Sequence, residues 1–103
     1  MRNLDERVRS LSDLDRIPLI KALIAYDAEA ERIAKAGSRA KSGSPARYRA
    51  EEARGQIARL GRIIYFLRFR SPASGATAAD QALCEMLATK LEAKGQWVGE
   101  DSL

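Results

Sequence analysis

The sequence has no histidine and only one cysteine, Cys84. Without histidine, the chain lacks an imidazole partner for a nucleophile, a general base near neutral pH and an imidazole metal ligand. One cysteine cannot form a disulfide within the chain or a thiolate zinc cage. Asp27 and Glu31 fall on one helix face, but their sequence neighbourhood lacks the apolar residues that suit a carboxylate to acid–base catalysis. We therefore expect a non-enzymatic protein without metal or cofactor, in which Cys84 is an inert, packed thiol.

Long apolar runs are also absent. A helix that spans a bilayer needs roughly 20 apolar residues, and every stretch between two charges in this sequence is far shorter. Residues 1–7 carry charges of both signs and no apolar core of a signal peptide. We expect a cytoplasmic protein that has no membrane partner.

The composition indicates one folded helical domain, residues 1–103. Of the 103 residues, 46% are hydrophobic and 31% are charged, which is typical of a folded chain. No segment keeps a two-residue alternation of apolar and polar side chains, as a strand would. The predicted fold is all-α, a small antiparallel bundle with a short N-terminal helix over 3–11. Its three main helices are expected over about 15–36, 45–70 and 77–94.

Turn and capping residues set the boundaries of these helices. Gly37 ends the apolar pattern of the first main helix. Ser44 followed by Pro45 is typical of a helix start, with serine as the N-cap and proline as the first helical residue. Between these points the chain is rich in glycine, serine and bases, which predicts a flexible basic loop at 37–45. A short C-terminal tail, 96–103, holds the only tryptophan, Trp97.

Positive charge is concentrated in the middle of the chain. The net charge is +4, but residues 32–70 contain eleven bases and only two acids, Glu51 and Glu52. Arginine outnumbers lysine thirteen to five, and its planar guanidinium suits phosphate or carboxylate recognition. A GC-rich genome also supplies arginine and alanine in excess, and small basic regulatory proteins of this type are common in bacteria and their phages. That origin explains the number of arginines better than it explains their clustering.

A helical wheel of the central helix places arginines and aromatics opposite its apolar stripe. Arg59, Arg62, Phe66 and Phe69 lie on that outer side, with Tyr65 at its margin. Three interpretations compete. The last or the N-terminal helix covers the aromatics, with the arginines at the edge; a homodimer or larger homo-oligomer uses them; or they contact nucleic acid or an acidic protein surface.

Together these features predict a small regulatory binding protein whose basic central helix and 37–45 loop contact a polyanion. The simplest polyanion is nucleic acid, bound with little sequence specificity because no helix-turn-helix signature is present. The side chains expected to contact phosphates are Arg39, Lys41, Arg47, Arg54, Arg59 and Arg62. The alternative is a protein adaptor or inhibitor, or a homo-oligomeric bundle, that uses a face formed by Tyr65, Phe66 and Phe69.

Overall fold

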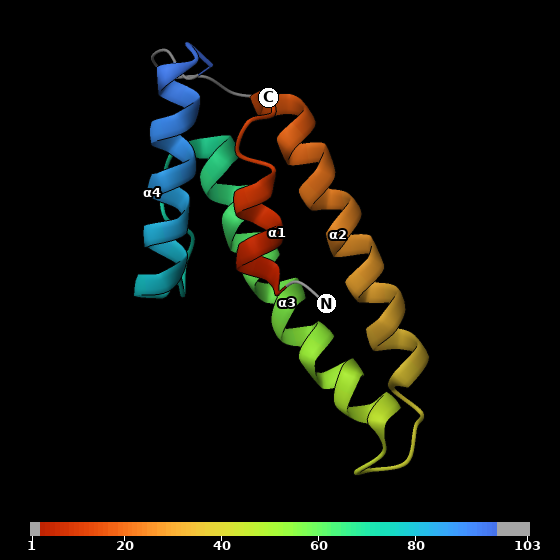
Figure 1. Ribbon diagram of the computed structural model, residues 1–103. Helices are drawn as coiled ribbons and strands as arrows, with labels where there is room; N and C mark the ends of the chain where they lie inside the picture. Colours follow the sequence, from red (N-terminus) through yellow and green to blue (C-terminus); the bar gives the residue numbers. More distant parts are fainter. Residues whose placement is uncertain (1–2, 97–103) are drawn as a thin grey trace.

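The computed structural model describes residues 3–96 and contains four helices in that range (Figure 1). They are α1 (Leu4–Ser10), α2 (Arg16–Gly37), α3 (Pro45–Phe69) and α4 (Ala78–Ala93). The described part of the chain contains no strand. The predicted all-α bundle with a short N-terminal helix is therefore confirmed. The predicted tail and its Trp97 lie, apart from Gln96, outside the described residues.

Side-chain caps hold the starts of three helices. The Asn3 side chain accepts the N–H of Glu6 at 2.9 Å at the start of α1, and the Ser44 hydroxyl accepts the N–H of the third residue of α3 at 3.2 Å. At α4, the Thr77 hydroxyl accepts the N–H of Asp80 at 3.1 Å, and the Asp80 carboxylate accepts the N–H of Thr77 at 3.3 Å. This reciprocal capping box satisfies two backbone donors that the helix leaves unpaired.

The connections decide the directions of the helices. α2 and α3 form an antiparallel hairpin, whereas α1, α3 and α4 run the same way through the molecule (Figure 1). Asp5 and Asp80, near the starts of α1 and α4, both bond to Arg59 of α3. At the other end, Arg70 pairs with Glu92 near the end of α4. The predicted antiparallel packing thus applies to α2 and α3. By contrast, α4 lies parallel to α3, because the connection after α3 runs back along that helix before α4 begins (Figure 1).

Two separate cores stabilise the fold. The main core lies where all four helices meet, and its fully buried aliphatic side chains include Leu19, Leu23, Leu60, Ile63, Leu67, Leu87 and Leu91. The second core lies within the α2–α3 hairpin alone and consists of Ala30, Ala34 and Ala53, with Ile33 and Ile57 packed against them. Because this second core is built mainly from alanine, it buries far less apolar surface than the first.

The α2–α3 hairpin projects beyond the other helices. The molecule measures 49 × 24 × 21 Å, with a radius of gyration of 14.8 Å, against about 13 Å for a compact chain of this length. At the projecting end, α2 and α3 approach so closely that a Cβ on Gly37 would clash with the Ala46 carbonyl oxygen and lie 2.7 Å from the Ala50 Cβ. We call residues 35–49, which turn the chain from α2 into α3, the hairpin tip.

Two glycine-to-alanine substitutions should change stability in opposite directions. At Gly61 of α3 nothing lies within 4 Å of an added Cβ, so Gly61→Ala should raise the free energy of unfolding by up to about 1 kcal/mol through helix propensity. Gly37→Ala should lower it by about 1–3 kcal/mol, because the methyl group overpacks the contact between α2 and α3. Urea unfolding followed by circular dichroism measures both changes. A Gly37→Ala protein as stable as wild type would contradict the close helix approach.

Candidate nucleic-acid interface

One buried carboxylate organises the arginines of α3. Asp80 is 1% exposed, and each of its carboxylate oxygens accepts a bond from a different arginine. Arg59 Nε donates to one oxygen at 2.6 Å, and Arg62 Nε donates to the other at 2.6 Å. Arg59 also pairs with Asp5 of α1. These four residues, the Asp80 cluster, join α1, α3 and α4 at one point.

The cluster keeps Asp80 ionised. Burial by itself raises the pKa of this carboxyl. The hydrogen bonds from Arg62, from Arg59 and from the backbone N–H of Thr77 stabilise the charged form and outweigh that effect. The pKa of Asp80 therefore lies below its ordinary value. The two guanidiniums supply the countercharge that a buried carboxylate needs.

The Asp80 cluster gives Arg59 and Arg62 a structural role that the sequence does not indicate. We predicted phosphate contacts for both side chains. In the structure, each points to Asp80 and is about three-quarters shielded from solvent. A phosphate that bound them would compete with Asp80 for the same donors. Their contact with phosphate stays a prediction, and it is a weaker one than for arginines that have no acidic partner.

The aromatic side chains of α3 divide between the core and the surface. Phe66 is 4% exposed and belongs to the main core, where α4 and the segment before it cover it. Phe69 is 56% exposed and lies against Tyr65, with the ring centroids 4.7 Å apart and the ring planes tilted by 49°. The interpretation that another helix covers the aromatics is thus right for Phe66 and wrong for Phe69. The predicted interface of three aromatics is reduced to Tyr65 and Phe69.

The hairpin tip holds the largest group of cations without acidic neighbours in sequence. Residues 35–49 contain five bases and no Asp or Glu, and the bases are Lys35, Arg39, Lys41, Arg47 and Arg49. Arg47 donates to the Ser38 carbonyl at 2.7 Å, which ties the two sides of the loop, and lies 3.5 Å from Glu51. The other four are exposed and form no ion pair within residues 3–96. Three predicted contacts, Arg39, Lys41 and Arg47, therefore lie together here.

Arg54, the remaining predicted contact, lies one to two turns further along α3. Its side chain is exposed, and among the described residues it has no ion-pair partner. Because Arg47 and Arg54 are seven residues apart, two turns of helix bring them to nearly the same side of α3. Arg54 therefore extends the basic surface of the tip toward the body of the molecule, whereas Arg59 and Arg62 lie apart from it in the Asp80 cluster.

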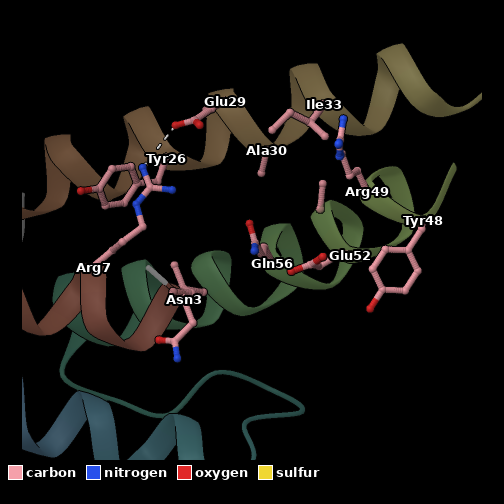
Figure 2. Close-up of a pocket in the computed structure, with 12 residues that line it drawn as sticks. Asn3, Arg7, Tyr26, Glu29, Ala30, Ile33, Tyr48, Arg49, Glu52 and Gln56 are labelled. Carbon is pink, nitrogen blue, oxygen red and sulfur yellow. Dashed lines mark hydrogen bonds and ion pairs between the residues drawn. The ribbon is translucent and has the colours of Figure 1, made fainter. Parts of the chain in front are cut away.

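A groove of about 430 Å³ runs between α2 and α3 beside the start of α1 (Figure 2). At one end, Arg7 stacks on the Tyr26 ring with 3.8 Å to the ring centroid and pairs with Glu29 at 3.3 Å. Tyr48 and Arg49 lie at the other end (Figure 2). The groove shares Tyr48 and Arg49 with the tip, but unlike the tip its lining carries charges of both signs.

Sequence reasoning missed the role of Arg16. This side chain is 2% exposed; its Nε donates to the Leu67 carbonyl at 3.0 Å and its Nη2 to the Arg68 carbonyl at 3.0 Å. Both carbonyls belong to the last turn of α3, where backbone carbonyls have no N–H donor from their own helix. A cation at the first position of α2 opposes the dipole of that helix, and this mismatch was the only signal in the sequence.

Cys84 has the environment expected of an inert thiol. It is buried in the main core. Burial, reinforced by the nearby negative charges of Asp80 and Glu85, raises its pKa to about 11. The thiol is therefore protonated at neutral pH, and a thiolate nucleophile is not available at this position.

Residues 3–96 nowhere gather three His, Cys, Asp or Glu side chains in a position to hold a metal ion. In the same range, no helix has the length and apolar character needed to cross a membrane. Comparisons of the chain with family models, with curated proteins and with solved structures found no match.

Acid should weaken the fold through the Asp80 cluster. Because the folded-state pKa of Asp80 is depressed, its contribution is fully present above the unfolded-state pKa of about 3.9 and is lost as the pH falls through the folded-state value. Asp80→Asn should lower the free energy of unfolding at pH 7 by about 2–3 kcal/mol, since two hydrogen bonds to a charged acceptor are weakened.

Urea unfolding at pH 7 and at pH 3 measures this effect, and the gap between variant and wild type should narrow at pH 3. Glu31→Gln is the matched control, because Glu31 is exposed and makes no ion pair within the described range. Asparagine can still accept the Thr77 N–H, so the cap of α4 is kept. An Asp80→Asn protein as stable as wild type at pH 7 would show that the cluster contributes nothing to the fold.

Proposed function

We propose that this protein is a non-enzymatic nucleic-acid-binding protein whose hairpin tip contacts the phosphate backbone with little sequence specificity. The observation that carries the proposal is the five-base, acid-free tip at the end of a projecting hairpin. Such a surface can approach an extended polyanion without a clash from α1 or α4. Local positive charge also steers a polyanion toward the site before contact.

The side chains assigned to phosphate contact are Arg39, Lys41, Arg47 and Arg49, with Arg54 continuing the surface along α3. Phosphate contacts fix position but carry no information on base identity. Exposed side chains on and beside the 38–44 loop can adapt to phosphates at variable spacing, which supports binding that is largely independent of sequence. The Lys35 ammonium, at the end of α2, adds to the same positive potential.

A second candidate function is supported by the exposed ring pair of Tyr65 and Phe69. Contiguous apolar groups on a surface often mark a protein contact, and these rings lie at the opposite end of α3 from the tip. On this proposal the protein is an adaptor or inhibitor, or associates with a second copy through this face. The two candidate functions use different ends of the molecule and can be tested separately.

The tip should dominate the salt dependence of nucleic-acid binding. With about four phosphate contacts, the slope of log affinity against log salt for a duplex should be roughly −4, because each neutralised phosphate releases about 0.9 counterion. Arg39→Ala combined with Lys41→Ala should make that slope shallower by about two. Fluorescence anisotropy with a labelled 20-base-pair duplex over a salt series measures the slope.

Arg9→Ala combined with Lys21→Ala is the matched control. It removes the same charge from exposed positions of α1 and of the second turn of α2, outside the hairpin tip. The control should leave the slope nearly unchanged, and circular dichroism should show both double variants folded. Equal weakening by both double variants would mean that net charge alone attracts the duplex, and absence of binding at low salt would remove the nucleic-acid proposal.

The second candidate predicts self-association through the ring pair. Light scattering after size exclusion should then give a mass above 11.4 kDa, and Phe69→Glu should restore a soluble monomer, because a charge at a two-fold interface is buried twice. Since Phe69 is largely exposed, the variant should keep its helical content. A wild-type protein that stays monomeric at high concentration would eliminate the homo-oligomer.

A further inference from the structure

Tyr48 is the most exposed large hydrophobic side chain among the described residues. It is 68% exposed, although tyrosine usually buries a large part of its ring. It lies on the first turns of α3 between two arginines, Arg47 and Arg49. The structure therefore places one aromatic ring at the α3 side of the hairpin tip, next to its last two arginines.

No packing role within the described residues accounts for this ring. Figure 2 shows Arg49 directed toward α2 beside Ile33, while Tyr48 leaves α3 on the side away from α2. Tyr48 takes part in no ring pair and no cation–π contact within residues 3–96. Because the side chain is 68% exposed and stacks on no other ring or cation in that range, a ligand can reach the ring.

The other exposed aromatics differ in this respect. The rings of Tyr65 and Phe69 lie against each other at 4.7 Å, so each already has an aromatic partner. They also lie near the far end of α3, away from the tip cations. Among the aromatic residues of the described range, Tyr48 thus combines an exposed ring without an aromatic partner with exposed cations that have no ion-pair partner.

We propose that the ligand of the hairpin tip is single-stranded nucleic acid, with one unpaired base stacked on Tyr48 and adjacent phosphates held by Arg39, Lys41 and Arg49. This inference rests on the proposed function and assigns the class of nucleic acid. An unpaired base offers a free face to an aromatic ring, and such stacking is independent of base identity. The bases of a duplex are already stacked on each other, so a duplex can use only the cations of the tip.

The negative charge of Glu52, close to Tyr48 in sequence, allows a second test of the proposed site. It lies one turn after Tyr48 on α3, lines the groove near Arg49, and has no ion-pair partner in the described part of the chain. Its carboxylate repels a strand that passes over Tyr48. Glu52→Gln should therefore strengthen single-strand binding, by about twofold to fivefold at low salt, without affecting the stacked base.

The experiment compares three labelled probes of equal length: a 20-nucleotide oligothymidylate, a strand of the same length without bases, and a 20-base-pair duplex. Wild type should bind the oligothymidylate more tightly than the other two. Tyr48→Leu should weaken binding to oligothymidylate about tenfold, the typical effect of losing one stacked base. Its affinity for the baseless strand and for the duplex should not change, and neither should the salt slope. Tyr48→Trp should restore binding.

Tyr65→Leu is the matched control, because it removes an exposed tyrosine from the same helix outside the tip. It should bind oligothymidylate like wild type. Three results would each overturn the single-strand assignment. The first is a Tyr48→Leu protein that binds oligothymidylate as tightly as wild type, and the second is a wild-type protein that binds the duplex more tightly than oligothymidylate. The third is a loss of oligothymidylate affinity in the Tyr65→Leu protein instead of the Tyr48→Leu protein. If the Arg39→Ala and Lys41→Ala double variant still weakens duplex binding in those cases, the proposed function stands. Failure of wild type to bind any probe at low salt would overturn both.

Discussion

The attachment of α4 to the rest of the fold depends on the carboxylate of Asp80. This one group accepts bonds from two arginines of α3, caps the start of α4 and, through Arg59, is linked to Asp5 of α1. Without a negative charge at this point, two guanidiniums on the inner side of α3 would face each other beneath α4. Aliphatic side chains of the main core pack around the cluster. At the last turn of α3, the Arg16 guanidinium donates to the Leu67 carbonyl. The fold is thus an aliphatic core with two charged anchors on the second half of α3, one at Arg59 and Arg62 and one at the last turn of the helix.

This arrangement separates the arginines of one helix into two groups. Arg59 and Arg62 are bound to an acidic side chain and hold helices together. Arg49 and Arg54, on the same helix, are exposed and unpaired within the described range. The sequence shows both groups as one basic segment. The difference arises because α4 reaches only the half of α3 that follows Arg54. The acidic residues of α4 therefore pair with arginines there, whereas in the tip only Arg47 has an acidic partner, Glu51 of its own helix.

The helices were predictable because their signals act over a few residues. Ser44 and Thr77 cap from within their own turns, and the apolar periodicity needs only one helix. The parallel return of α4 was not predictable, because it depends on how the connection after Arg70 packs. The same connection decides that Phe66 is covered and Phe69 is not, although both lie on the outer half of the wheel. The tip cations were predictable as charges, but the positions of all four helices were needed to show that, apart from Arg47, they have no acidic partner within the described residues.

Because the two cores differ in size, the two ends of the α2–α3 hairpin should differ in their free energy of local unfolding. The end built on Ala30, Ala34 and Ala53 buries few methyl groups, whereas the end built on leucines shares its core with α1 and α4. Segments with few buried apolar contacts open at free energies below that of global unfolding. Amide hydrogens near the tip should therefore exchange with solvent faster than those around Leu60 in the same helix. A ligand that bridges α2 and α3 at the tip favours the closed form, so binding there would appear as slower exchange in a segment that contacts no other helix.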